Sequence, residues 1–389
     1  MRDAVIVEAV RTPIGKGKPT GALHGVHPVD LLAHSLREVV QRSGIDPELI
    51  DDVIGGVVTQ VGEQAVNVTR RAALAAGYPE SVPATTVDRQ CGSSQQAIHF
   101  AAQGVIAGAY DVVVAAGLES MSRIPMGTSV LGATDLDGVA FRERYPEELV
   151  PQGISAELIA ARWGIGRTAM DEFALASHEK AAAATKNGSF EAQLAPLAGL
   201  TTDEGIRVGS TPATLAGLRP AYYSEAYAAR FPEIGWNVTA ANASQINDGS
   251  AAVLITTSEK AKQLGLTPLA RLHSFAVAGD DPLLMLTAVI PATRKVLRRA
   301  GLQLSDIDLI EINEAFASVV LAWQRDTGAD LSRVNVHGGA IALGHPLGAS
   351  GARLATTLVH AMRERGARYG LQTMCEAGGL ANATVFERL

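Results

Sequence analysis

Residues 84–117 of the chain read ATTVDRQCGSSQQAIHFAAQGVIAGAYDVVVAAG, and this stretch decides the fold class. The strand-like run Ala84–Val87 leads into a turn, after which apolar residues repeat at helical spacing over residues 97–106. Residues 112–116 then form a continuous apolar run closed by Gly117, which is typical of a buried strand. Strand, helix and strand in alternation predict an α/β fold with a parallel or mixed sheet covered by helices.

The same alternation continues on both sides of this stretch. We expect strands at residues 5–7, 53–58, 308–312 and 369–374, and helices at residues 30–40, from 168 to about 186, and after a glycine-rich turn at 338–351. The helix at Thr168 begins with Thr-Ala-Met-Asp, which resembles a capping box. The loop, helix and strand of residues 91–117 recur in residues 348–378, which indicates a weak internal duplication.

The bulk composition limits the kind of protein. The chain has 389 residues, 47% apolar and 19% charged, enough for two or three domains with sizeable cores. Its net charge of −7 and the lack of a basic stripe disfavour a nucleic-acid partner. No apolar run approaches the roughly 18 residues of a membrane span, and the first residues do not resemble a signal peptide. We therefore expect a cytoplasmic protein with no membrane partner.

The chain has two cysteines, Cys91 and Cys375, too few for a disulfide framework and an improbable zinc site. Two small buried apolar residues are the ordinary interpretation. Cys91, however, lies at a predicted helix start, where the helix dipole and free N–H groups are expected to lower its pKa and favour a nucleophilic thiolate. Cys375 follows a predicted strand and precedes Glu376-Ala377-Gly378-Gly379, a backbone that a ligand can approach closely.

Two polar residues complete the candidate site. His345 lies in Gly344-His345-Pro346, where the neighbours fix a loop and present the ring. Asn313 begins Asn-Glu-Ala-Phe just past a predicted strand, where open α/β sheets place functional groups. A single histidine is more often an ordinary core or surface residue, and a single asparagine after a strand is usually a turn residue. The evidence therefore lies in their combination with the two cysteines.

Together these motifs resemble the thiolase family. That family carries a cysteine before a Ser/Gly-rich helix start, then Asn-Glu-Ala-Phe, then Gly-Gly-Ala-Ile-Ala-Leu-Gly-His-Pro, then a cysteine followed by glycines, and this chain has them in the same order from residue 91 to 379. The resemblance implies duplicated halves in a layered α/β/α/β/α arrangement with an inserted loop domain. Residues 1–120 with 238–265 would form the first half, 121–237 the inserted loop domain, and 266–389 the second half.

The resemblance also implies a coenzyme A-dependent acyltransferase that makes or cleaves a carbon–carbon bond in a 3-oxoacyl thioester. Coenzyme A and acetyl-CoA would be substrates, with no permanently bound cofactor and no metal. Cys91 would accept the acyl group, His345 would take its proton, and Cys375 would move the proton at the α carbon. Asn313 would hold a water for one oxyanion hole, and the N–H groups of Cys91 and Ala377 would form the other.

The binding contacts and the substrate are less defined. Ser244 lies in a segment that resembles the family's coenzyme-binding segment, whereas Arg207 resembles an arginine near the adenine end and equally fits a solvated surface residue. Acetoacetyl-CoA is the first choice of substrate. A bulky sterol side chain is the alternative, because the run Cys-Gly-Ser-Ser-Gln-Gln from Cys91 is like that of some actinobacterial thiolases. The resemblance further implies a homodimer or homotetramer paired at a sheet edge near the nucleophile.

The chain also departs from the family pattern. Ala377 replaces a usual glycine, Gln95-Gln96 follows the nucleophile where Gly and Leu are common, His337 replaces a frequent asparagine, and Gln152 stands where many members have methionine. A ketoacyl synthase would share the fold but would use a second histidine and lack the C-terminal cysteine with glycines. A non-catalytic acyl-CoA-binding relative would have lost the nucleophile or the histidine, and this chain keeps both.

Overall fold

A mixed ten-stranded sheet runs through the structure, a computed structural model that describes residues 2–389. Its strands are β1 (Val5–Arg11), β2 (Gly15–Lys16), β3 (Asp52–Gly56), β4 (Ala84–Val87), β5 (Val112–Ser120), β6 (Asn247–Thr256), β7 (Ala270–Gly279), β8 (Leu309–Ile312), β9 (Tyr369–Glu376) and β10 (Leu380–Arg388). Their order is β4-β3-β5-β6-β1-β7-β10-β9-β8, with β2 paired to β6. β3 runs parallel to β4 and β5, and β8 runs parallel to β9, while the other pairs are antiparallel. The expected mixed sheet is confirmed.

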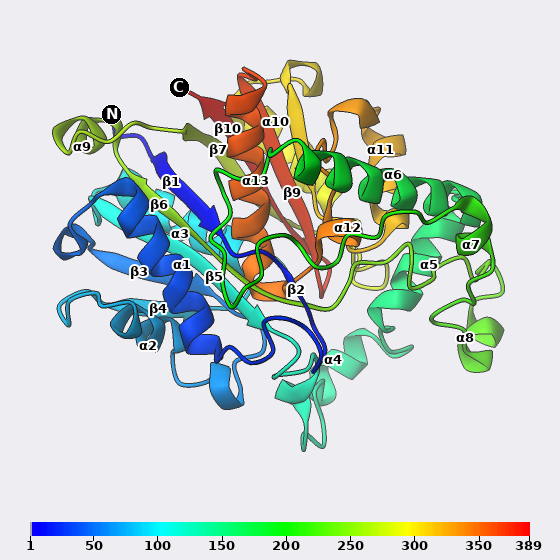
Figure 1. The fold of residues 1–389 in the computed structure, drawn as a ribbon. Helices are drawn as coiled ribbons and strands as arrows, with labels where there is room; N and C mark the ends of the chain where they lie inside the picture. Colours follow the sequence, from blue (N-terminus) through cyan, green and yellow to red (C-terminus); the bar gives the residue numbers. More distant parts are fainter. Residues whose placement is uncertain (1) are drawn as a thin grey trace.

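Some helices cover the two halves of this sheet, and two others lie between the halves. The helices are α1 (Pro28–Ser43), α2 (Val68–Ala75), α3 (Ser93–Ala107), α4 (Gly138–Arg144), α5 (Gln152–Arg162), α6 (Arg167–Lys186), α7 (Pro212–Ala216), α8 (Glu225–Arg230), α9 (Ser258–Gln263), α10 (Val289–Ala300), α11 (Ala317–Thr327), α12 (Ala340–Leu343) and α13 (Ser350–Glu364). α3 and α13 pack against each other in the middle, α1 and α2 cover the first half, and α10 and α11 cover the second. The layered α/β/α/β/α arrangement is confirmed, and Figure 1 shows α13 at the centre of the molecule.

The central layer explains the long apolar run in the sequence. All nine residues of β5 are buried, because β3 and β6 flank the strand while α1 and α3 cover its faces. Ile98 of α3, Leu358 of α13 and Phe386 of β10 belong to one apolar core between the two sheet halves. Burial of these side chains therefore fixes both central helices relative to both halves of the sheet.

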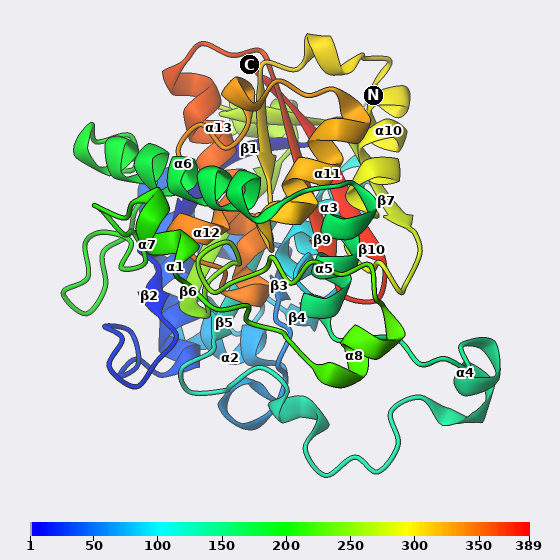
Figure 2. The same ribbon diagram turned by 90° about the vertical axis from the view of Figure 1, so that its right-hand side faces the viewer.

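The segment between the halves is mostly helical. α5 and α6 pack on α11, whereas α4 and the loops on either side of it project away from the body of the molecule, as Figure 2 shows. Arg11 of β1 forms a buried two-pronged ion pair with Asp203 of this segment, through Nη1–Oδ1 at 2.7 Å and Nη2–Oδ2 at 2.9 Å. The division of the chain into two halves and an inserted loop domain stays a prediction.

Two local expectations need correction. α6 begins at Arg167 after Gly166, which makes no side-chain cap, so the expected capping box at Thr168 is wrong. Asp171 instead pairs with Arg167 at 2.7 Å and accepts a hydrogen bond from Asn242 at 2.9 Å, and these contacts use the carboxylate that would have capped the helix. The glycine-rich turn at 338–351 also contains the short helix α12.

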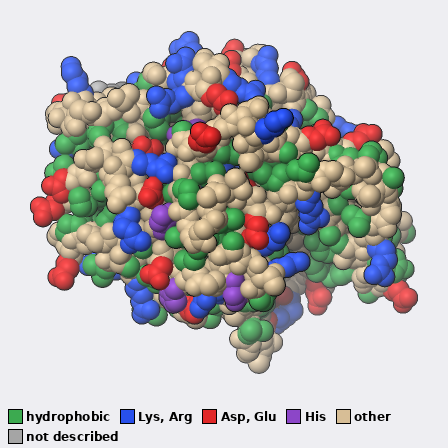
Figure 3. All heavy atoms as spheres, viewed as in Figure 1, with side chains coloured by type: hydrophobic (Ala, Val, Ile, Leu, Met, Phe, Trp, Pro, Cys, Tyr) green, Lys and Arg blue, Asp and Glu red, His purple; other side chains and the backbone are tan. Residues whose placement is uncertain are grey.

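The helices and the surface show two features that bear on possible partners. Within residues 2–389, every helix falls short of the length and apolar character that crossing a membrane requires. On the face shown in Figure 3, Lys and Arg side chains are interspersed with Asp and Glu, and cations do not gather in one patch. The pattern on this face agrees with the even distribution of charge along the sequence.

Asp203→Asn should destabilise the fold strongly. Both side chains of the Arg11–Asp203 pair are wholly buried, so the variant leaves a guanidinium buried without its counter-charge. Breaking such a pair costs about 3–5 kcal/mol. Equilibrium unfolding in urea should show this as a lower midpoint. Asp135→Asn, which breaks the exposed pair with Arg142, is the control and should leave the midpoint unchanged. An unchanged midpoint for Asp203→Asn would contradict the prediction.

Candidate active site

Cys91 lies in a tight turn between β4 and α3. Gln90, just before it, has a left-handed backbone with φ of 49°, which a non-glycine residue adopts at some strain. Ser93 holds the turn, because its Oγ accepts from the Arg89 N–H at 2.9 Å and donates to the Gln90 carbonyl at 2.6 Å. The thiol is therefore held at the helix start, as the sequence predicted, and Cys91 is 5% exposed.

The acid strength of this thiol differs from the expectation. Burial, and then the carboxyl of Glu376, raise the pKa of Cys91 to about 12, so the expected lowering by the helix start is wrong for the unliganded site. The backbone N–H groups of Cys91 and Ala377 act in the opposite direction, and both therefore lie near the sulfur. A thiol this weakly acidic needs a base that removes its proton as it attacks.

His345 is held by contacts on three sides. Its backbone N–H donates to Oδ1 of Asn247 at 2.9 Å, and its Nδ1 lies 2.6 Å from Oγ of Ser350. The Ser350 hydroxyl donates to the Pro346 carbonyl at 2.9 Å, so its lone pairs face Nδ1 and that nitrogen carries the ring proton. Nε2 then carries the lone pair, which accepts a long hydrogen bond from Nδ2 of Asn313 at 3.5 Å.

The imidazole is neutral over the ordinary pH range. Burial, and then the charge of Arg353, lower the pKa of His345 to about 3. Asn313 is also wholly buried, and its Oδ1 has no hydrogen-bond partner among residues 2–389. His345 thus offers a base at Nε2, and Asn313 beside it offers an unused acceptor.

Cys375 is the second-last residue of β9 and is wholly buried. Its pKa is raised well above the ordinary value, first by burial, then by Cys91 and then by Glu376. Burial therefore outweighs the local backbone, which acts to lower the pKa of this thiol. Because Cys91 raises the pKa of Cys375, the two thiols lie near each other, although they are 284 residues apart in the sequence (375−91).

A cavity of about 370 Å³ leads from the surface to this site. It is lined by Lys16, Lys18, Met121, Met126, Gln152, Arg207, Ala221, Tyr222, Ala240, Ala243, Ser244, Gln245, Ile246, Phe316, His345 and Leu347. Met121 and Leu347 also pack against Cys91, so the thiol lies just behind the cavity wall. The cavity therefore brings the predicted binding residues Ser244 and Arg207 into the same space as His345.

The two predicted binding residues differ in their exposure to solvent and in their hydrogen bonds. Arg207 is exposed, and its backbone N–H donates to Nδ1 of His178 at 3.1 Å. Ser244 is partly buried, and its N–H donates to the Ala315 carbonyl at 2.9 Å. Lys16 and Lys18 also line the cavity, and the sequence analysis did not identify them. Their spacing beside Gly15 and Gly17 carried no recognised phosphate-binding pattern.

Two buried carboxylates behind the site were also missed. Glu119 accepts hydrogen bonds from the N–H groups of Val58 at 3.0 Å, Thr59 at 3.1 Å and Gly348 at 2.9 Å. It thereby ties the end of β5 to the loop that follows His345. A single charged residue in the otherwise apolar run of β5 was the sequence signal for this role.

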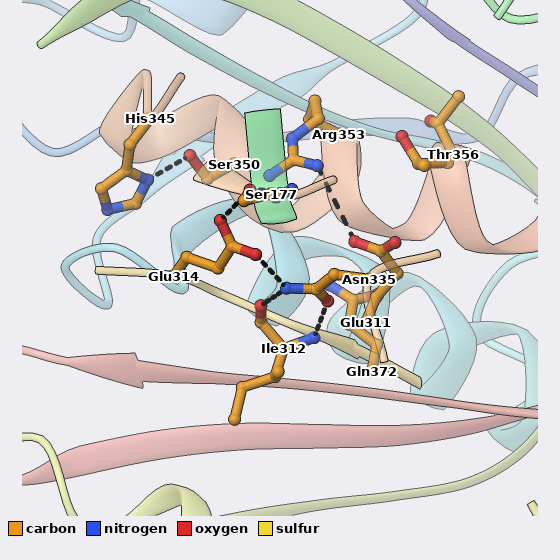
Figure 4. Close-up of polar contacts among 12 residues, drawn as sticks. Ser177, Glu311, Ile312, Glu314, Asn335, His345, Ser350, Arg353, Thr356 and Gln372 are labelled. Carbon is orange, nitrogen blue, oxygen red and sulfur yellow. Dashed lines mark hydrogen bonds and ion pairs between the residues drawn. The ribbon is translucent and has the colours of Figure 1, made fainter. Parts of the chain in front are cut away.

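Glu314 plays a similar part on the other side. It accepts from Oγ of Ser177 at 2.7 Å, Nδ2 of Asn335 at 2.8 Å and the N–H of Ile341 at 3.0 Å. Figure 4 shows Glu314 between Ser177 and Asn335, with the imidazole of His345 directed toward Ser350. These bonds fix the start of α12, the helix just before His345.

The chain was compared with known proteins. The family model for the N-terminal domain of thiolase matches residues 4–259, and that for the C-terminal domain matches residues 266–388. The steroid 3-ketoacyl-CoA thiolase FadA6 of Mycobacterium tuberculosis is 46% identical over all of this chain and 95% of its own length. The 3-ketoacyl-CoA thiolase of Bacillus subtilis is 41% identical over the full length of both.

Solved structures give the same result. The crystal structure of the Bacillus anthracis acetyl-CoA acetyltransferase superposes with a TM-score of 0.88 at 39% identity. That of human mitochondrial 3-ketoacyl-CoA thiolase superposes with a TM-score of 0.88 at 35% identity. In both cases the match covers all of this chain and 99% of the other.

Ser350→Ala should slow the reaction of Cys91 with iodoacetamide by about tenfold at pH 7. Without the Ser350 hydroxyl, Nδ1 of His345 loses its acceptor and the tautomer with a free Nε2 is no longer favoured. Peptide mass spectrometry measures the modification of Cys91 over time. Ser318→Ala is a matched control, because Ser318 is also buried and bonded to a backbone carbonyl, at 2.9 Å. Equal rates for Ser350→Ala and wild type would rule out this role of Ser350.

Proposed function

This chain belongs to the thiolase family, and from that premise we propose how its residues carry out the reaction. It is an acyl-CoA C-acyltransferase that acts on 3-ketoacyl-CoA, a reaction of fatty-acid and lipid metabolism. One observation carries the residue assignment: cationic residues and His345 line the same cavity, and the two cysteines lie close together behind it. Coenzyme A serves as a substrate in this proposal and no cofactor is permanently bound.

In thiolysis, Sγ of Cys91 attacks the C3 carbonyl carbon of the 3-ketoacyl-CoA while Nε2 of His345 takes the thiol proton. The lone pair on Nε2, which makes only a long hydrogen bond with Asn313, and the neutrality of the ring support this step. The C2–C3 bond then breaks, which leaves the acyl group on Cys91 and a carbanion on acetyl-CoA. The raised pKa of Cys91 supports proton removal during attack instead of a pre-formed thiolate.

Cys375 donates its proton to that carbanion and releases acetyl-CoA. A second coenzyme A then enters, its thiol loses a proton to the Cys375 thiolate, and its sulfur takes the acyl group from Cys91. The proton balance closes, because Cys375 gives one proton in the first half-reaction and regains one in the second, while His345 returns its proton to the Cys91 sulfur that leaves in the second. The proximity of the two sulfurs supports this division of work.

Two sites would stabilise the oxygens that gain charge. The backbone N–H groups of Cys91 and Ala377 lie near the Cys91 sulfur, where the acyl oxygen would be. Protonated Nε2 of His345, with a water on the unused Oδ1 of Asn313, would serve the thioester oxygen. Ser244 would contact the pantetheine arm, and Arg207 would contact the phosphate-bearing end at the mouth of the cavity.

The acyl group is proposed to be larger than acetoacetyl. The 46% identity to a steroid 3-ketoacyl-CoA thiolase supports this, as do the adaptable side chains of Met121 and Met126 in the cavity wall. Acetoacetyl-CoA, the first expectation from the sequence, remains the second candidate. Its support is the 39% identity to an acetyl-CoA acetyltransferase.

The chain is also proposed to form a homodimer or homotetramer. β4 is the edge strand of the sheet, is incompletely buried and lies directly before the Cys91 turn. Phe100 and Ile106 of the adjacent α3 are 40% and 39% exposed. An unpaired strand edge beside exposed apolar side chains suits pairing with a second copy. Sedimentation at micromolar concentration should give a mass above the 40.5 kDa of one chain. A cytoplasmic location belongs to the same proposal, and cell fractionation tests it.

Paired cysteine variants test the mechanism. Cys91→Ala should abolish acylation, because the variant lacks the sulfur that is proposed to attack, and intact-mass measurement after incubation with acyl-CoA detects the acyl group. Cys375→Ser should still acquire the acyl group but should exchange the α protons of acetyl-CoA in deuterated buffer about 10²–10⁴-fold more slowly. Circular dichroism controls for folding. Acylation of Cys91→Ala, or exchange at the wild-type rate in Cys375→Ser, would refute the roles assigned.

Steady-state thiolysis of a chain-length series of 3-ketoacyl-CoA esters decides the substrate. We expect kcat/KM to rise from acetoacetyl-CoA to long or polycyclic acyl groups, because longer groups bury more apolar surface against the cavity wall. The series needs a single enzyme preparation, so that the ratio between esters is independent of its active fraction. A maximum at acetoacetyl-CoA would favour the second candidate.

A further inference from the structure

Glu376 is wholly buried at the end of β9 and lies against the turn of Cys91. A Cβ built on Gly92 would lie 1.8 Å from Oε1 of Glu376, so the carboxyl rests directly on the backbone at the start of α3. The φ of Gly92 is −86°, a value that any residue adopts. The carboxyl of Glu376 thus fills the space where a side chain at position 92 would lie, while the backbone conformation of Gly92 does not demand a glycine.

The carboxyl of Glu376 lacks the partners that a buried anion needs. Within residues 2–389, neither of its oxygens accepts a hydrogen bond, and Nε of nearby Arg89 is likewise buried without a partner. Burial raises the pKa of Glu376 well above its ordinary value, whereas Arg89 and then the Asn382 backbone lower it, and Asp88 raises it. An unpaired buried carboxylate is costly, so burial favours the uncharged form of this carboxyl.

The charge of Glu376 acts on both reactive thiols. After burial it is the largest influence that raises the pKa of Cys91, and it also raises the pKa of Cys375. Glu119 is the other carboxyl that raises the pKa of Cys91. An uncharged Glu376 fills its space without opposing loss of the thiol proton, whereas a charged Glu376 would oppose it.

Hydrogen bonds beside this contact fix α3 on β10. Thr384 accepts from Nε2 of Gln95 at 2.9 Å and lies 2.8 Å from Nε2 of His99. Asn382 donates to Oε1 of Gln96 at 3.2 Å. All five side chains are buried, so the start of α3 and the β9–β10 pair are held in one register. The two glutamines that depart from the family pattern thus belong to this contact between the halves.

We infer that Glu376 is a positioning residue whose carboxyl, seated on Gly92, holds the Cys91 turn against the end of β9 and so sets the two thiols relative to each other. The inference rests on the roles given to Cys91 and Cys375 in the proposed function. Glu376 itself does not touch the reacting atoms. It acts through the backbone on which Cys91 and Ala377 present their N–H groups.

Two variants at this position separate shape from charge. Glu376→Ala removes the contact with Gly92 and should slow acylation of Cys91 by roughly tenfold or more, with the KM for coenzyme A unchanged. Glu376→Gln keeps the shape and should restore most of that rate. Glutamine never ionises, so the pH midpoint of Cys91 alkylation by iodoacetamide should fall by roughly one unit relative to wild type.

Glu311→Gln is the matched control, because Glu311 is also buried, with its pKa raised to about 8 by burial, but faces Arg353 and not the thiols. It should leave the alkylation midpoint of Cys91 unchanged. Wild-type acylation in Glu376→Ala, or coincident midpoints for Glu376→Gln and wild type, would overturn the inference. If Glu376→Ala does not fold, the Glu376→Gln midpoint decides alone. If wild type is never acylated, the proposed function fails, while the midpoint still tests the influence of Glu376.

Discussion

The first turns of α3 and α13 touch backbone to backbone at the centre of the molecule, and the site depends on that contact. A Cβ on Gly351 would lie 2.2 Å from the backbone nitrogen of Gln95, and one on Gly348 would lie 2.5 Å from the Leu118 carbonyl oxygen. Backbone atoms cannot move aside as the end of a long side chain can. The short distance between the two backbones therefore requires glycine at these positions. Because α3 follows Cys91 directly and α13 follows the His345 loop, the same contact brings the thiol and the imidazole together.

Local patterns pointed to the proposed catalytic residues but not to the pKa values of their side chains. Cys91, His345 and Cys375 each lie in a motif at a helix start, a fixed loop or a strand end, and the buried runs of β5 and β9 were visible as apolar segments. The pKa of Cys91 was not predictable in this way, because the carboxyl that raises it comes 285 residues later in the chain (376−91). Burial by distant segments outweighs the helix start, and a local pattern contains no information about it.

The two buried carboxylates behind the site also show what a local sequence pattern cannot predict. Each accepts a hydrogen bond from a backbone N–H group in a separate segment of the chain: Glu119 from Gly348, and Glu314 from Ile341. Their residue types and positions were visible in the sequence, but their hydrogen-bond partners depended on how separate segments of the chain pack. The start of α6 was misplaced for a related reason, because Asp171 meets Arg167 and Asn242 and is not available as a cap. Tertiary contacts therefore determined the hydrogen-bond partners and the helix start at positions where the local sequence signals were ambiguous.

The position of β10 in the sheet has a consequence for how the molecule is built during synthesis. β10 follows every other strand in chain order, yet it inserts between β7 and β9. Until residues 380–388 emerge from the ribosome, β7 and β9 present open edges to each other, and the Thr384 and Asn382 bonds to α3 cannot form. Pairing of β10 with the distant β7 is slow, because a long loop must close before any contact forms. The bonds that hold α3 on the sheet therefore depend on the last strand to be synthesised, even though α3 itself is made early.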